Sequence, residues 1–139
     1  MFQQITIIGN LGRDPESKQS RNGKTYAQVS LAASRSLGQG QPKETTWFSV
    51  TAWERLGQYL CNYAQKGSMV MVTGRIQPDA QTGGPRIWTD SNGNPHAAFE
   101  VVATEVRILN GFKTDEQRNA TPQYGRAAQP EQGTFEQYY

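Results

Sequence analysis

The sequence is poor in the residues on which most enzymes and metal proteins depend. It contains one cysteine, Cys61, and one histidine, His96, in 139 residues. A single cysteine excludes an internal disulfide and a cysteine-based zinc site. Neither residue has a neighbour that would complete a nucleophile–base pair. We therefore expect Cys61 to be buried filler in a helix and His96 to be a surface residue. We expect no catalytic activity, no metal and no cofactor.

Long apolar runs are missing as well. No stretch approaches the roughly 20 apolar residues of a membrane span, and the first residues lack the basic and apolar blocks of a signal peptide. These absences predict a cytoplasmic protein. Hydrophobic residues make up only 35% of the chain, beside 14 glycines. This composition predicts that part of the chain is unfolded.

Neither sign of charge is in large excess. The formal net charge is only +2, which does not by itself indicate a nucleic-acid-binding protein. Residues 1–109 hold eleven Lys/Arg and eight Asp/Glu, a net charge of +3, whereas residues 110–139 hold three and four, a net charge of −1. The positive charge therefore belongs to the first part of the chain, where its local arrangement decides its effect.

What the sequence does contain is apolar alternation typical of β-strands. It predicts strands at residues 4–8, 26–34, 45–53, 68–76 and 97–109. In the second strand, Gln28 and Ser30 belong to a polar, outward face. Gly9–Gly12 breaks or bends the chain after the first strand. Apolar residues at i, i+3, i+4 and i+7 predict a helix over residues 54–65, with Lys66 and Gly67 as its basic last turn and C-terminal glycine.

Five strands with one helix between the third and fourth match an all-β OB-fold, a five-stranded Greek-key barrel. An SH3-like barrel or a small α+β sheet is the alternative interpretation of the same elements. Residues 77–95 are rich in Gly, Pro and Asn and predict a long β-hairpin arm or loop. We expect two parts: the OB-fold domain at residues 1–110, and a disordered Gln/Pro/Gly-rich tail at residues 111–139.

The strand at residues 45–53 carries the clearest functional signal. Its alternation puts Trp47 and Trp53 on one face, with only Ser49 and Thr51 between them. Flat aromatic rings on a polar sheet face are typical of platforms that stack nucleic-acid bases, although strand aromatics are common for structural reasons. Trp88 lies in the predicted arm, where there is little core to enter. It either meets a ligand or pins the arm to the barrel or to another subunit.

Cationic side chains flank these tryptophans in the sequence. A base-stacking groove also needs cations that meet phosphates. The candidates are Lys18, Arg35, Lys43, Arg55, Lys66, Arg75 and Arg86. For Arg55, which follows Trp53 by two residues, simple solvation is the alternative role. Tyr59 and Tyr63 fall at helical spacing and are interpreted as core or interface residues.

Several motifs in order resemble the bacterial-type single-stranded DNA-binding protein family over residues 3–109. The matching stretches are Ile7–Glu16, Val29–Ala32, Glu44–Trp47, Lys66–Ser68, Gly74–Arg75, Trp88–Asp90 and Glu100–Ala103. The resemblance implies an OB-fold homotetramer, or dimers of double-OB chains, that wraps single-stranded DNA and has no catalytic activity. By resemblance, Trp47, Trp53 and Trp88 fall at base-stacking positions. Lys18, Arg55, Lys66, Arg75 and Arg86 fall near phosphate-contacting positions.

The chain departs from that family at three places. The loop at residues 36–40 has no aromatic residue, and residues 78–85 look like an insertion into the arm. The chain ends in Gly133–Tyr139 rather than in the acidic run closed by Pro-Phe, through which the family recruits replication and repair proteins.

The expected function is sequence-tolerant binding and protection of single-stranded DNA in replication, recombination and repair, near the nucleoid. The alternatives are an oligomeric OB-fold adaptor of the primosome kind and an RNA-binding OB module.

Overall fold

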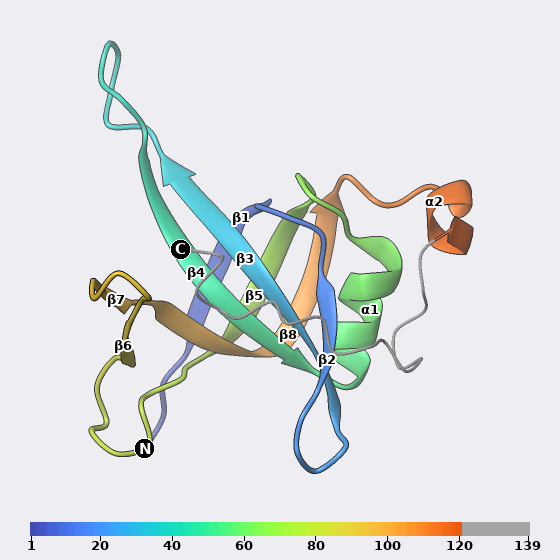
Figure 1. The fold of residues 1–139 in the computed structure, drawn as a ribbon. Coiled ribbons are helices and arrows are strands. Elements are labelled where there is room, and N and C mark those ends of the chain that lie inside the picture. The colour runs from blue at the N-terminus through green and yellow to red at the C-terminus, as the bar shows by residue number, and fades with distance from the viewer. Residues whose placement is uncertain (121–139) are drawn as a thin grey trace.

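The computed structural model describes residues 1–120, so the part of the predicted disordered tail beyond residue 120 lies outside the described residues. Five strands form a closed barrel (Figure 1). They are β1 (Ile5–Leu11), β3 (Thr25–Arg35), β4 (Glu44–Trp53), β5 (Met69–Ile76) and β8 (Phe99–Asn110). The strand order is β1-β5-β8-β4-β3, and pairing of β1 with β3 closes the barrel. The β4–β8 pair is parallel and the others are antiparallel. Helix α1 (Arg55–Tyr63) lies between the third and fourth barrel strands, so the predicted OB-fold is confirmed.

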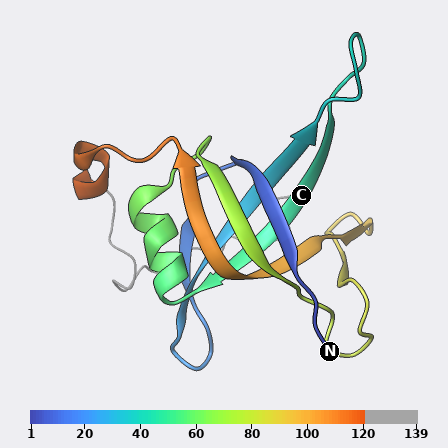
Figure 2. The same cartoon turned by 180° about the vertical axis from the view of Figure 1, so that it is seen from behind.

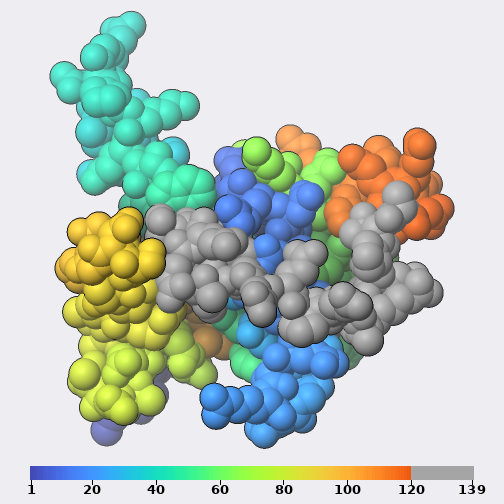
Figure 3. Space-filling view, viewed as in Figure 1, coloured from blue at the N-terminus to red at the C-terminus, as the bar shows by residue number. Residues whose placement is uncertain are grey.

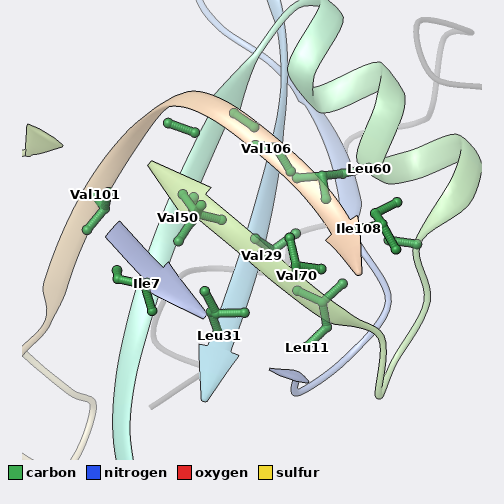
Figure 4. Close-up of a cluster of buried hydrophobic side chains, with 14 residues drawn as sticks. Ile7, Leu11, Val29, Leu31, Val50, Leu60, Val70, Val101, Val106 and Ile108 are labelled. Carbon is green, nitrogen blue, oxygen red and sulfur yellow. The ribbon is translucent and has the colours of Figure 1, made fainter. Parts of the chain in front are cut away.

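The core fills the barrel with aliphatic side chains, as period-2 alternation requires. Figure 4 shows Ile7, Val50 and Val70 pointing inward from three different strands, with Leu60 of α1 at the same cluster. Val50, Val70 and Leu60 are fully buried. The buried face of α1 therefore packs on the barrel and fixes where β4 ends and β5 begins.

Strand β1 is longer than the predicted strand at residues 4–8, because Gly9 bends the chain without ending it. Residues Ile5–Asn10 pair with β5, and β1 then pairs with β3 at Asn10 and Leu11. A Cβ at Gly9 would lie 2.4 Å from the Ala32 carbonyl oxygen, so only glycine allows this crossing. A short strand that the sequence did not predict, β2 (Glu16–Gln19), follows and pairs with β3 around the Asn22–Gly23 turn.

The prediction for the end of the helix is wrong by two residues. Helix α1 ends at Tyr63 and has no basic residue in its last turn. Gly67, with φ of 87°, instead lies in a turn closed by a 2.9 Å hydrogen bond from the Ser68 amide to the Gln65 carbonyl. Its left-handed conformation suits the third position of a type II turn. Lys66 therefore lies in a loop between α1 and β5.

Two segments project from the barrel on the side away from α1, as Figures 1 and 2 both show. One is the β3–β4 loop at residues 36–43. The other contains the predicted arm, and the two form separate protrusions in Figure 3. The hairpin in this arm is short: β6 (Ile87–Thr89) pairs with β7 (Pro95–Ala97), and residues 77–86 form a loop.

Residues 111–120, which the sequence assigned to the tail, lie within the described part of the chain. They contain α2 (Asp115–Ala120). Lys113 is buried, its Nζ donates to the Cys61 carbonyl at 2.9 Å, and its amide donates to the Tyr63 carbonyl at 2.8 Å. The sequence missed this contact because a lysine that binds the C-terminal carbonyls of a distant helix leaves no local pattern. No helix among residues 1–120 is long and apolar enough to cross a bilayer.

Candidate nucleic-acid interface

The outer face of β4 carries the two tryptophans that the alternation predicted there. Trp47 is 43% exposed and Trp53 is 37% exposed. They lie six residues apart on one strand, a separation of about 20 Å at the usual rise per residue. Between them, Ser49 is buried and Thr51 is half-buried. This surface, Trp47 to Trp53 with its β3 neighbours, is called the β4 platform below.

The β3 part of the platform differs from the prediction. Gln28 and Ser30 were expected on an exposed polar face, yet they are only 3% and 4% exposed. Gln28 lies between Thr51 of β4 and Glu16 of the unpredicted strand β2, and its Nε2 donates to Ser49 Oγ at 3.4 Å. The extra strand places a polar side chain on either side of Gln28. The surface between the two tryptophans is therefore made of buried polar side chains of β3 and β4.

Trp47 lies directly over Gly12. A Cβ at Gly12 would come within 2.7 Å of Trp47 Cζ3 and 3.0 Å of Cη2. The ring therefore uses the space that the glycine leaves open. Gly9–Gly12 looks like no more than a break in a strand from the sequence, because the contact with Trp47 joins residues 35 positions apart.

Trp53 has an aromatic neighbour that only the pairing of β3 with β4 reveals. Tyr26 is its partner across β3 and β4, and the ring centroids are 4.8 Å apart at an angle of 44°. Burial raises the pKa of the Tyr26 hydroxyl, which stays protonated at neutral pH. Lys18 of β2 is the partner of Tyr26 on the other side of β3, so Trp53, Tyr26 and Lys18 lie side by side across three strands. Burial lowers the Lys18 pKa, and the carboxylate of Glu16 at 3.9 Å opposes that shift.

Trp88 stands on β6 with a cation and an imidazole against its ring. The Arg86 guanidinium lies 4.7 Å from the ring centroid, and the His96 ring stacks at 5.8 Å and 25°. Arg86 donates two hydrogen bonds to Glu100 Oε1, from Nε at 3.1 Å and Nη2 at 2.9 Å. Glu100 is the β8 neighbour of Ser49. The arm is therefore linked to the middle of the β4 platform.

His96 has a more definite place than the surface position predicted for it. Its Nε2 lies 2.8 Å from Asp90 Oδ2, and its side chain is only one-third exposed. The hydrogen bond from His96, followed by that from the Asn94 amide, lowers the pKa of Asp90 to about 2. The Asp90–His96 pair thus closes the hairpin turn on the side of Trp88.

The predicted cations divide into two groups. Three are already paired with carboxylates: Arg35 with Glu44 at 2.5 Å, Arg86 with Glu100 at 2.9 Å, and Lys18 with Glu16 at 3.9 Å. The other four are exposed and form no ion pair within residues 1–120: Lys43, Arg55, Lys66 and Arg75.

These four exposed cations surround the platform. Arg55 begins α1 two residues after Trp53. Arg75 of β5 lies opposite Val102 of β8, and Val102 lies opposite Thr51 of β4. The Lys66 amide donates to Asp14 Oδ1 at 2.7 Å, close in the chain to Gly12 under Trp47. Lys43 lies at the base of the β3–β4 loop, beside Glu44.

The described residues offer little that could perform catalysis. Residues 1–120 contain no group of three side chains that could hold a metal ion. Cys61 is buried, as predicted, and burial raises the pKa of its thiol to about 12. What residues 1–120 do present is a flat aromatic face with cations around it, which suits binding of a polyanion that has aromatic rings.

Comparison with known proteins agrees with this interpretation. The family described as the single-strand binding protein family matches residues 2–109. A single-stranded DNA-binding protein of Caldanaerobacter subterraneus is 33% identical over 110 residues, which cover 78% of this chain and 69% of that protein. Single-stranded DNA-binding protein 1 of Chlorobaculum tepidum is 29% identical over 140 residues, covering 94% and 82%. A single-stranded DNA-binding protein of Neisseria meningitidis is 32% identical over 113 residues, covering 79% and 61%.

Proposed function

The chain belongs to the single-strand binding protein family, and from this premise we propose that it binds single-stranded DNA with little sequence preference. The relatives are named as binding proteins and not as enzymes. The observation that carries the proposal is the β4 platform, where Trp47 and Trp53 are both more than one-third exposed on one face. Every base has a π-face, so stacking on such rings accepts any sequence. Each stack contributes about 1–3 kcal/mol.

The exposed cations supply the second part of the mechanism. We assign phosphate contacts first to Lys43, Arg55, Lys66 and Arg75, because no carboxylate within residues 1–120 neutralises them. Lys18, Arg35 and Arg86 stay in the proposed interface. Each of them already faces a carboxylate, so its positive charge is partly neutralised before DNA binds. Duplex DNA is expected to bind weakly, since its base faces are hidden in the stack.

We also propose that the chain forms a homotetramer. Strand β1 pairs with β5 along Ile5–Asn10, but β3 pairs with it only at Asn10 and Leu11. The other edge of residues 5–8 therefore borders an open groove of about 390 Å³, lined also by Ala33 and Phe48. An unpaired strand edge beside apolar side chains suits pairing with the same strand of a second copy.

A second surface would join two such dimers. Ile8, Met69 and Leu109 point outward from β1, β5 and β8 and are 53%, 38% and 47% exposed. A strand edge and a sheet face, each meeting its own copy about a two-fold axis, build a closed assembly of four chains. Four linked platforms on one DNA strand raise the avidity through effective concentration. Light scattering is expected to give four times the chain mass at micromolar concentration; a stable monomer would contradict the proposal.

In the cell, we propose that this binding protects exposed single strands during replication, recombination and repair. The test is a titration of the full chain with oligo(dT), followed by tryptophan fluorescence at two salt concentrations. We expect strong quenching and an affinity that falls as salt rises. Absence of both quenching and a gel shift would overturn the proposal. Parallel titrations with poly(U) and with duplex DNA measure the preference for single-stranded DNA over RNA and over duplex.

A further inference from the structure

The backbone joins the Trp88 hairpin to barrel strand β8 through one buried residue, Ala98, but the strands of the hairpin do not extend the barrel sheet. Strands β6 and β7 have three residues each and form a sheet of their own, separate from the barrel sheet. Isolated two-stranded hairpins are only marginally stable in water. No ladder of backbone hydrogen bonds between β6 and β4 fixes Trp88 relative to the β4 platform. Side-chain contacts must supply that orientation.

Arg86 and Glu100 supply the contact that reaches the barrel. Glu100 is fixed on β8 by its register with Ser49, and its carbonyl accepts the Gln77 amide at 2.8 Å. Its side chain is only 12% exposed, and its carboxylate accepts hydrogen bonds from both Nε and Nη2 of Arg86. The same guanidinium lies 4.7 Å from the Trp88 ring centroid. The Arg86 guanidinium thus donates hydrogen bonds to Glu100 of the barrel and lies over the indole ring of Trp88.

We propose that Glu100 and Arg86 are positioning residues that hold the Trp88 ring beside the β4 platform, and that Arg86 does not act as a phosphate ligand. The inference rests on the proposed function, in which Trp88 stacks on a base. Nε and Nη2 are both bound to Glu100, so turning this fork toward a phosphate would leave a largely buried carboxylate without its counter-charge, which is strongly unfavourable. A planar fork that also stacks on a ring is a property of arginine that lysine lacks.

The experiment measures oligo(dT) affinity at several salt concentrations for Arg86→Lys, Arg86→Gln and Glu100→Gln. We expect all three variants to weaken binding about five-fold or more, a part of the stacking contribution of one base. The slope of log affinity against log salt is expected to stay at its wild-type value. Loss of affinity in Arg86→Lys is the decisive result, because that variant keeps the positive charge.

The matched control is Arg118→Lys on α2. Arg118 also pairs with a carboxylate, Asp115, and lies 5.3 Å from an aromatic centroid, that of Tyr63. This motif lies outside the proposed interface, so Arg118→Lys should leave the affinity unchanged. In a Trp88→Ala background, Arg86→Lys should add no further loss, because the ring that it positions is gone.

A phosphate role for Arg86 gives the opposite pattern and would overturn the proposal. Arg86→Lys would then keep wild-type affinity, Arg86→Gln would reduce the salt slope by about 0.7, and Glu100→Gln would strengthen binding. Unchanged affinity in all three variants, or additive losses with Trp88→Ala, would overturn it as well.

A readout on the free protein separates this inference from the proposed function. With Trp47→Phe and Trp53→Phe, Trp88 is the only tryptophan left. Its emission should shift to longer wavelength in Arg86→Lys and in Glu100→Gln, whether or not the protein binds DNA. An unchanged emission would refute the positioning role even if wild-type binding is confirmed.

Discussion

Trp53 and Trp88 present the same side chain on two different kinds of support. Trp53 ends a strand of ten residues that is hydrogen-bonded to β3 along its whole length and to β8 on its other side. Trp88 stands on a strand of three residues that lies outside the barrel sheet. The first ring is oriented by backbone pairing, and the second by contacts with Arg86 of the preceding loop and His96 of β7. Substitutions in the β4 platform and in the arm should therefore have different effects on stability and on DNA binding.

The largest difference should appear when a methyl group is added to a glycine in each region. A Cβ at Gly74, in β5, would lie 2.1 Å from the Val102 carbonyl oxygen, whereas the nearest atom at Gly84, in the arm, is 3.7 Å away. Gly74→Ala should lower the free energy of unfolding by about 3 kcal/mol. Gly84→Ala should change it by less than about 0.5 kcal/mol. Urea denaturation measures both, and similar losses would contradict the contrast between barrel and arm.

The next effect concerns binding rather than folding. Trp53→Ala should weaken oligo(dT) binding by about 1–3 kcal/mol through the lost stack, while Trp53→Phe should keep part of that affinity. Titration at fixed salt measures both variants. Phe112→Ala is a suitable control because this exposed aromatic follows β8, outside the platform. An affinity unaffected by Trp53→Ala would return Trp53 to a structural role.

A smaller effect on DNA binding tests how closely the Trp47 ring is held against Gly12. Gly12→Ala pushes a Cβ against Trp47 Cζ3, so the ring must tilt. We expect about 1 kcal/mol less binding free energy in the wild-type background. In a Trp47→Ala background, the same substitution should have no further effect. Equal losses in both backgrounds would show that Gly12 acts on the fold and not through the ring.

The smallest expected effect is the pH dependence of the arm. Asp90 has a pKa of about 2, below that of an ordinary aspartate, because His96 and backbone amides bond to its carboxylate. Its contribution to stability is therefore complete above about pH 4 and is lost as the pH falls through the folded pKa. The stability difference between wild type and Asp90→Asn should have its full value at about pH 4 to 5 and be largely lost near pH 2. Thermal melts at stepped pH values measure it, and a difference that persists at pH 2 would contradict the assignment.

The sequence predicted the platform well because local alternation determines it. Trp47 and Trp53 follow the strand period, and the helix that follows has a clear apolar face, so residues 44–63 match the prediction closely. Strand β2 was missed because Glu16–Gln19 has no apolar alternation and forms only by pairing with β3. Local pattern cannot show a strand whose only support is its neighbour.

The arm was predicted less completely for the same reason. Its Gly and Pro content indicated a projecting segment, and Trp88 was recognised as a candidate. The partners that place Trp88 were not found, because Glu100 is distant in sequence and His96 had no motif around it. Tyr26, likewise, is an ordinary strand residue until its register with Trp53 is known. Site residues that act across strands need the register, which the sequence does not contain.

The contact between Lys113 and α1 also has a practical consequence for labelling. Cys61 is 7% exposed, and with a pKa of about 12 only about one thiol in 10⁵ is ionised at pH 7. A cysteine introduced on the β3–β4 loop would react far faster, so a fluorescent probe can be attached there without removing Cys61. Slow modification of Cys61 would then report any opening of the structure that exposes its thiol.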